Sequence, residues 1–261
     1  MNIRQREIIV QSATDIRDVL GTKVLSLRRE EAIALLKEVV REGRFTRLAF
    51  LNAHNANVAC EVPDFARALD HFLVLPDGIG VDIASRVLYG HAFAENLNGT
   101  DFVPDLLRAF ERPITVALVG SRTEHGSLAR DKLEAIAPNL RFVFINDGYF
   151  DAARQDLILE ELRSIKPDIL LVAMGVPRQE FWISENLTAD HCTLAIGVGA
   201  LFDFLSGQVP RAPLWMRRLR IEWVHRLVLE PGRMWRRYVL GNPLFLFRVL
   251  RQKLGSRGGW R

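Results

Sequence analysis

The stretch Ile169-Leu-Leu-Val-Ala-Met-Gly-Val-Pro-Arg-Gln-Glu180 decides the fold class of this sequence. It opens with an uninterrupted apolar run, Ile169–Ala173, passes through a glycine-containing loop and enters the amphipathic segment Gln179–Leu187. Another apolar run, Thr193–Ile196, follows. Apolar runs separated by a loop and a helical segment are typical of a β-α-β unit, in which helices cover both faces of a parallel sheet.

The same alternation extends over most of the chain. The other predicted strands are Leu48–Asn52, Phe72–Leu75, Ile114–Val119 and Phe142–Ile145. The other predicted helices are Glu31–Arg41, Asp101–Phe110, Ser127–Ile136 and Ala153–Ile165. We therefore predict an α/β fold, with a parallel sheet and helices on both faces, as a catalytic core over residues 1–207.

Positive charge is concentrated at the C-terminal end of the chain. The 261 residues have a formal net charge of +4, whereas residues 211–261 hold 13 Lys and Arg against 2 Asp and Glu, together with four of the five tryptophans. We predict that residues 208–261 form a basic helical appendage. Arginine and tryptophan on apolar helices suit an anionic lipid surface; a solvated basic tail and a nucleic-acid-binding tail are the alternatives.

Proline and glycine divide this appendage into short predicted helices. A helix over Leu214–Leu229 is expected to end at Pro231-Gly232, and the next one at Gly241-Asn-Pro243. No apolar run reaches the roughly 18 residues that a membrane-spanning helix needs, and the scattered charge of Met1–Asp15 differs from a signal peptide. With only Cys60 and Cys192, no disulfide framework is expected. We expect a cytoplasmic protein that touches a membrane through its appendage.

The loops that follow the predicted strands carry the candidate catalytic residues. In a parallel sheet these loops meet at the carboxyl edge, where ligands of doubly wound folds bind. Asp77 directly follows an apolar run and lies between Pro76 and Gly78, which keep other side chains away. A carboxylate there could accept a proton from a sugar hydroxyl as a general base. A turn in which Asp77 bonds its own backbone is the alternative.

Several other polar residues lie at predicted helix starts. Asp82 is expected in the first turn of a helix, where a carboxylate complements the helix dipole. Thr100 and Asp101 are expected to cap the next helix, and Gly99 to let a ligand approach the backbone closely.

The remaining candidates are an amide, two histidines and three arginines. Gln179 offers the donor and the acceptor that reading a uracil edge or a sugar hydroxyl needs. His54 and His125 lack partners at metal-ligand spacing, so no metal site is predicted. Arg226, Arg233 and Arg236 are spaced so that they would share one face of a helix, and guanidinium groups bind phosphate oxygens; a role confined to the surface is the alternative.

Taken together, these residues resemble the WecG/TagA/CpsF glycosyltransferases over roughly Leu48 to Leu246. The resemblance depends on several motifs in one order: Leu75-Pro-Asp-Gly-Ile-Gly80, Asn98-Gly-Thr-Asp101, Met174-Gly-Val-Pro-Arg-Gln-Glu180, Gly197-Val-Gly-Ala-Leu-Phe-Asp203, Arg211-Ala-Pro-Leu-Trp-Met216, Glu222-Trp, Glu230-Pro and Gly241-Asn-Pro. It implies a Rossmann-like core with a C-terminal appendage, acting as a peripheral enzyme on the inner face of the cell membrane.

The resemblance also implies a reaction. Such enzymes transfer a sugar from a UDP-sugar to a polyprenyl-diphosphate-linked sugar, with inversion and without a required metal or cofactor. Asp77 matches the catalytic base of the family, and the three arginines match residues that hold a diphosphate. The predicted substrate-binding residues are Asn52, Gly78, Gly99, Gln179, Arg226, Arg233 and Arg236.

Two departures from the family pattern bear on the donor sugar. Phe50 stands where many members have threonine, and Asn96 stands where an arginine often precedes the Gly-x-Asp motif. Loss of that arginine disfavours a uronic-acid donor, so glucose is the first choice and N-acetylmannosamine the runner-up.

Two other classes of protein are kept as alternatives. The first is a nucleotide-sugar or NAD-dependent oxidoreductase, which the missing Gly-x-Gly-x-x-Gly fingerprint disfavours. The second is a non-catalytic nucleic-acid-binding module, which leaves the strand-end loops unexplained. The sequence leaves open whether the chain forms a homo-oligomer.

Overall fold

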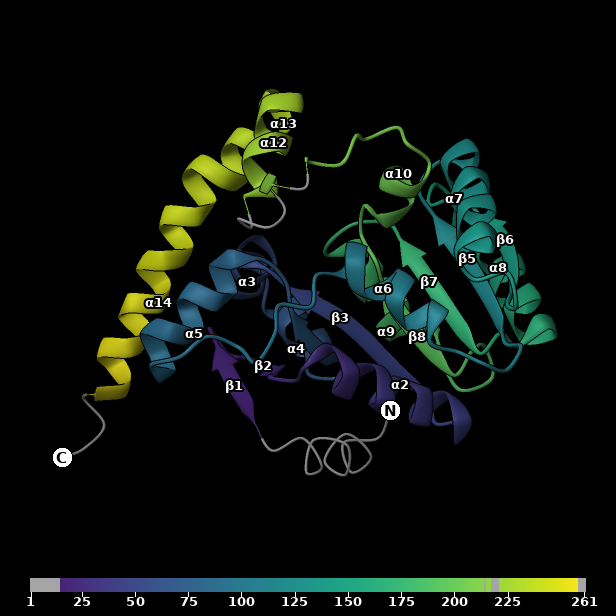
Figure 1. Cartoon of the computed structure of the whole chain (residues 1–261), viewed down its shortest axis with the longest axis horizontal. Coiled ribbons are helices and arrows are strands. Elements are labelled where there is room, and N and C mark those ends of the chain that lie inside the picture. Colours follow the sequence, from purple (N-terminus) through teal and green to yellow (C-terminus); the bar gives the residue numbers. More distant parts are fainter. Residues whose placement is uncertain (1–14, 214, 217–220, 258–261) are drawn as a thin grey trace.

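A computed structural model describes residues 15–213, 215–216 and 221–257 of the chain. Figure 1 shows a central sheet with helices on both sides and a long C-terminal helix, α14, that runs along the outside of α5. The predicted α/β, Rossmann-like architecture with a C-terminal helical appendage is confirmed.

The central sheet has six parallel strands in the order β4-β3-β8-β7-β5-β6. Their bounds are β3 Thr46–Leu51, β4 Leu73–Pro76, β5 Thr115–Gly120, β6 Arg141–Asn146, β7 Ile169–Ala173 and β8 Leu194–Gly197. All six strand predictions are confirmed, because continuous apolar runs are what a sheet buried on both faces requires.

Helices connect the strands and cover the sheet. Their bounds in the core are α2 Arg29–Arg41, α3 Ala53–Glu61, α4 Pro63–Leu69, α5 Ile79–Tyr89, α6 Gly99–Arg108, α7 Thr123–Ile136, α8 Ala152–Ile165, α9 Arg178–Asn186 and α10 Leu201–Leu205. Asp82 lies in the first turn of α5, as predicted, and is buried.

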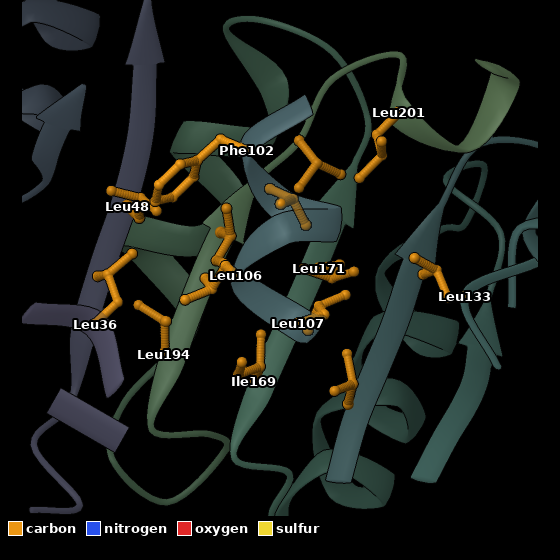
Figure 2. Packing of buried hydrophobic residues seen from close by; sticks show 14 of the residues in the cluster. Leu36, Leu48, Phe102, Leu106, Leu107, Leu133, Ile169, Leu171, Leu194 and Leu201 are labelled. Atoms are coloured by element: carbon orange, nitrogen blue, oxygen red, sulfur yellow. The ribbon is translucent and has the colours of Figure 1, made fainter. Parts of the chain in front are cut away.

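Alternating residues of each strand divide the core into two layers. In β3, Leu48 and Phe50 belong to one apolar cluster, whereas Ala49 and Leu51 belong to the other. This is the two-residue repeat of a strand whose opposite faces are both covered. Figure 2 shows the first cluster, in which Phe102, Leu106 and Leu107 of α6 lie over strands of the sheet.

A short antiparallel hairpin precedes the core and was not predicted from the sequence. Strands β1, Ile16–Val19, and β2, Thr22–Leu25, pair through a two-residue turn at Leu20-Gly21. Both turn residues have positive φ, 53° and 86°, as a type I′ hairpin turn requires. Leucine is an unusual residue in such a turn, so the hairpin signal that Asn-Gly would provide is missing.

The described part of the appendage consists of α12, Glu222–Leu229, and a continuous helical run of α13, Pro231–Trp235, the π-helical segment η1, Arg236–Leu240, and α14, Gly241–Arg257. Pro231 separates α12 from α13, as predicted. The prediction that Gly241-Asn-Pro243 ends a helix is wrong, since α14 begins there. Proline is tolerated in the first turn of a helix, and the wider turn of η1 precedes it.

Helix α14 packs directly on the core. It contacts α3 and α5, and its side chains Phe245 and Val249 are buried within the second apolar cluster. Arg248 donates to the backbone oxygen of Asn57 at 3.1 Å and to the carboxylate of Glu61 at 2.9 Å. The predicted boundary between core and appendage at residue 207 stays a prediction. Helix α14 belongs to the predicted appendage, but its buried side chains are part of the core.

No helix in the described ranges is both long and apolar enough to cross a membrane.

Candidate active site

The register between β3 and β4 places two predicted site residues next to each other. Leu51 pairs with Pro76 at the carboxyl end of these parallel strands, so Asn52 and Asp77 are the first residues beyond the pair. The backbone N–H of Asp77 donates to the carbonyl of Leu51 at 2.8 Å, which fixes the start of the loop. Sheet pairing therefore joins residues that lie 25 positions apart in the chain.

Asn52 is oriented by its role as the N-cap of α3. Its Oδ1 accepts from the backbone N–H of Asn55 at 3.0 Å, as an N-cap side chain usually does. The amide nitrogen therefore faces the other way and donates to Oδ2 of Asp77 at 3.2 Å. Asn52 thus binds one carboxylate oxygen and leaves the other for a ligand.

Gly78 and Asn96 shape the loop that follows Asp77. Gly78 has φ of 87° and ψ of 165°, a conformation that side chains other than hydrogen disfavour. Its N–H donates to Oδ1 of Asn96 at 3.0 Å, and its carbonyl accepts from Nδ2 of Asn96 at 2.9 Å. Asn96, which departs from the family pattern, therefore holds the loop that follows Asp77 by two hydrogen bonds.

A cavity of about 710 Å³ opens above this edge of the sheet. Its core wall includes Asn52, His54, Asp77, Gly78 and Asn96. The described part of the appendage closes the opposite side, and the cavity thus lies between the two predicted parts of the chain.

The appendage wall combines aromatic and cationic side chains. The rings of Trp223 and Tyr238 lie 5.7 Å apart, and both line the cavity together with Arg226 and Arg237. The guanidinium of Arg226 lies 5.2 Å from the ring of Phe204, which orients it toward the core. Aromatic faces can pack on sugar rings or prenyl groups, and the two cations suit an anionic substrate.

An ion pair joins this wall to the core. Arg211 lies 2.9 Å from the carboxylate of Asp101 in α6 and 3.7 Å from that of Glu222 in α12. Asp101 lines the cavity as well. These contacts link α12 to the first turn of α6 at the edge of the cavity.

Opposing influences set the pKa of Asp77. Burial raises the pKa of this carboxyl group, whereas the hydrogen bond from Asn52 and the charges of Arg237 and Arg226 lower it, and burial outweighs them. A raised pKa makes a carboxylate a better proton acceptor at the pH where it is still ionised. Asp77 therefore has both the position and the electrostatic surroundings of a general base.

His54 presents a neutral imidazole to the same cavity. Burial, assisted by the positive charge of Arg237, lowers its pKa to about 4. The ring is therefore uncharged near neutral pH and can exchange hydrogen bonds with a neutral part of a substrate. From the sequence we considered His54, which lies near the predicted ligand edge, only as a metal ligand; that its side chain lines the same cavity as Asp77 became evident from the tertiary structure.

Two predicted substrate-binding residues of the core, Gly99 and Gln179, do not line this cavity. Gly99 is buried, and a Cβ added to it would lie 3.0 Å from the ring of Phe50. The close approach that we expected for a ligand is thus made by a core side chain. Phe50 itself is buried against Phe102 and is not among the lining residues, so its difference from the family pattern carries no argument about the donor sugar.

Gln179 joins the loops that follow β7 and β8. Its Oε1 accepts from the N–H of Gly175 at 3.2 Å and of Gly199 at 3.0 Å, and its Nε2 donates to Glu180 at 2.8 Å. A Cβ on Gly197 would lie only 2.8 Å from that nitrogen, so glycine is needed there. This network favours a role in holding the loops, while direct contact of Gln179 with substrate stays a prediction.

The three predicted arginines are not equivalent. Arg226 lines the cavity. Arg236 is exposed, with its guanidinium 5.5 Å from the ring of its neighbour Trp235, and it is not a lining residue. The side chain of Arg233 lies outside the described part of the structure. Arg237, which we did not single out from the sequence, takes the place beside the core.

A further expectation concerns the start of α6 at the same edge. The predicted cap of α6 at Thr100 and Asp101 is wrong by two to three positions, because Asn98 is the N-cap and its side chain accepts from the N–H of Asp101. Among the residues that the structure describes, no group of three or more His, Cys, Asp or Glu side chains could hold a metal ion.

Comparison with known proteins decides the family. The Glycosyl transferase WecG/TagA/CpsF family matches residues 17–259. The chain belongs to this family. Two similar relatives are the N-acetylglucosaminyldiphosphoundecaprenol N-acetyl-beta-D-mannosaminyltransferases of Bacillus subtilis (strain 168) and Bacillus spizizenii, which are 34% identical over 185 residues and 31% identical over 184 residues. Each alignment covers 70% of this chain and 70% of the relative.

A relative of the same name from Staphylococcus aureus (strain MRSA252) is 29% identical over 181 residues, 69% of each chain. Membership in this glycosyltransferase family confirms the predicted enzyme class and disfavours both the oxidoreductase and the non-catalytic nucleic-acid-binding module. The names of these relatives specify transfer of N-acetylmannosamine. They agree with the runner-up among the predicted sugars and give no support to glucose, the first choice.

Proposed function

We propose that this glycosyltransferase transfers N-acetylmannosamine from its UDP derivative to the N-acetylglucosamine of a polyprenyl diphosphate. The observation that carries the proposal is the Asn52–Asp77 pair on the floor of a cavity whose other wall contains Arg226. The acceptor and the transferred sugar follow from the names of the relatives, and the UDP leaving group follows from the family resemblance.

Asp77 supplies the base in this mechanism. Asn52 binds Oδ2, and the acceptor hydroxyl donates to Oδ1. As the hydroxyl oxygen forms a bond to the anomeric carbon, its proton passes to Asp77. The bond between the anomeric carbon and the UDP oxygen breaks on the opposite face, which inverts the configuration, and UDP leaves with the electron pair.

The departing diphosphate requires stabilisation by positive charge. Arg226 is held by Phe204 at the wall of the cavity, within electrostatic range of Asp77. A preorganised guanidinium can neutralise charge as it develops on the leaving phosphate. We assign this role to Arg226; the corresponding roles of Arg233 and Arg236 stay predictions from the family resemblance.

We also propose that the appendage binds the cytoplasmic face of a membrane. Phe247, Leu250 and Leu254 of α14 are more than half exposed, and their spacing of three and four residues places them on one side of the helix. Phe245 and Val249 on the opposite side are buried in the core. A lipid surface would cover the outer side and present a polyprenyl-linked acceptor to the cavity.

The donor and the catalytic base can be tested in one assay. The full chain is given UDP-N-acetylmannosamine or UDP-glucose with N-acetylglucosamine on a short, water-soluble prenyl diphosphate. We expect transfer from the first donor and at least about a 10²-fold lower rate for Asp77→Asn, which keeps the shape of the side chain but removes the proton acceptor.

The control is Asp64→Asn, which removes an exposed carboxylate of α4 and is expected to leave the rate close to that of the wild type. Preference for UDP-glucose would refute the assigned sugar. An Asp77→Asn rate above about one tenth of the wild-type rate would contradict the assigned base.

A further inference from the structure

The core wall of the cavity carries three asparagines whose side chains are already bound within the protein. Asn52 caps α3 and donates to the carboxylate of Asp77, and Asn96 binds the loop that follows Asp77 through both of its amide atoms. Asn98 accepts from the backbone N–H of Asp101 and donates to its carboxylate, both at 3.0 Å. These amides therefore serve to shape the site.

His54, on the same wall, differs from these asparagines. It is the second residue of α3, it is half-buried, and it lines the cavity. None of the residues that the structure describes forms a hydrogen bond with its ring. The two ring nitrogens are therefore available to a substrate, one as a donor and the other as an acceptor while the ring is neutral.

The charge state of His54 decides which part of a substrate it fits. Its low pKa, caused mainly by burial and also by the charge of Arg237, keeps the ring uncharged at neutral pH. An uncharged imidazole does not attract a diphosphate, whereas it can donate to and accept from the hydroxyl and amide groups of a sugar. Arg226 and Arg237 line the cavity from the appendage, so the two walls offer different kinds of group.

Helix α3 lies against the start of α14 on the side that carries His54. Asn57 is three residues further along α3, which places it on the same side of the helix as His54. Its amide donates to the carbonyl of Gly241 at 2.7 Å, and its side-chain oxygen accepts from Arg248 at 3.0 Å. His54 therefore lines the part of the cavity beside α14, the helix whose outer side we propose to bind a membrane. A lipid-linked acceptor would enter from that side.

We propose that His54 binds an uncharged group of the acceptor sugar, either a hydroxyl beside the attacking one or the N-acetyl group, and so helps to select the acceptor. The inference rests on the proposed function, which supplies the acceptor and the role of Asp77. His54 lies two residues after Asn52, which binds Asp77. A sugar ring whose hydroxyl meets Asp77 therefore has its other polar groups in the same part of the cavity.

The first test removes the ring nitrogens in the full chain. His54→Phe keeps an aromatic ring without hydrogen-bonding atoms, His54→Gln keeps a donor and an acceptor, and His71→Phe, at an exposed position outside the cavity, is the control. We expect His54→Phe to lose about 3- to 30-fold in kcat/KM for the soluble prenyl acceptor, as for one lost hydrogen bond between uncharged groups. Affinity for UDP should be unchanged, and His54→Gln should recover part of the loss.

The second test varies the acceptor, because a purely structural role of His54 would not change which acceptor is preferred. The N-acetyl group and each hydroxyl that does not attack are removed in turn from the soluble acceptor. For one of these analogues the wild type should lose about 3- to 30-fold in kcat/KM. His54→Phe should lose less than about twofold with the same analogue, because its bond to that group is already missing.

Three results would overturn the proposal. They are a loss below about twofold in His54→Phe, a loss of UDP affinity in place of acceptor kcat/KM, and equal losses of His54→Phe and the wild type with every analogue. If His54→Phe does not fold, His54→Ala is compared with the wild type on the same analogues. Failure of the proposed function is seen separately, as a wild-type enzyme that gives no transfer to the soluble acceptor or whose rate does not depend on Asp77.

Discussion

Replacement of Glu180 by glutamine should remove a pH dependence from the stability of the fold. Glu180 is 1% exposed. Its Oε1 accepts from Gln179 at 2.8 Å, and its Oε2 has no hydrogen-bond partner within the described part of the chain. Burial raises its pKa from 4.5 to about 7. The folded protein thus holds this proton at a pH where the unfolded chain has released it.

The sign and size of the effect follow from the two pKa values. Because the pKa is higher in the folded state, the stabilisation is fully present below pH about 4.5 and is lost as the pH rises through about 7. At 1.36 kcal/mol per pKa unit, the wild type should lose about 2 to 3 kcal/mol of unfolding free energy from this group between pH 5 and pH 8. Glutamine resembles the protonated acid in shape but cannot ionise.

Urea unfolding at pH 5 and pH 8 measures this difference. The stability of Glu180→Gln relative to the wild type should increase by about 2 to 3 kcal/mol between the two pH values, since other titrating groups affect both proteins alike. Glu160→Gln, an exposed position on α8, is the matched control and should show no such increase. The reasoning is refuted if Glu180→Gln and the wild type differ by the same amount at both pH values.

Three further predictions concern the appendage and the cavity. Phe245→Ala should lower the free energy of urea unfolding by about 3 to 5 kcal/mol, because this ring lies on the side of α14 that faces the core and is 1% exposed. A loss no larger than that of Phe247→Ala, on the exposed side of the helix, would argue against the packing of α14 on the core. Arg248→Ala should lower stability by about 1 to 2 kcal/mol through loss of the bonds to α3, and an unchanged unfolding midpoint would contradict this. His54 should titrate by NMR near pH 4. Because the unfolded chain binds this proton at higher pH than the folded protein does, the free energy of unfolding should decrease as the pH falls from about 6.5 to about 4. Titration near 6.5 would show that the ring is not desolvated.

Uninterrupted apolar runs determined the fold class at the level of sequence. Runs such as Ile169–Ala173 bury both faces of a strand, and their alternation with helical segments is what a parallel sheet covered by helices on both sides requires. The site at the carboxyl edge could be predicted for a related reason. Asp77 and Asn52 each directly follow such a run, so the end of each strand places its side chain at the same edge.

Other features depended on contacts that no local pattern records. The hairpin turn at Leu20-Gly21 is set by backbone geometry rather than by a preferred turn sequence. The close approach of Gly99 involves Phe50, a residue of a strand distant in the chain. Gln179 likewise accepts hydrogen bonds from two backbone amides, which belong to different loops and are brought together only by the pairing of β7 with β8.

The appendage shows most clearly which features could be predicted from the sequence and which only the tertiary structure decided. Its basic and aromatic composition was evident from the sequence, as was the suitability of arginine for a diphosphate. That Arg226 and Arg237 line the cavity, whereas Arg236 lies against Trp235, became evident only from the tertiary structure, in which the appendage packs on the core through side chains such as Phe245. Local composition determines what a segment can bind, whereas tertiary packing determines which of its side chains face the cavity.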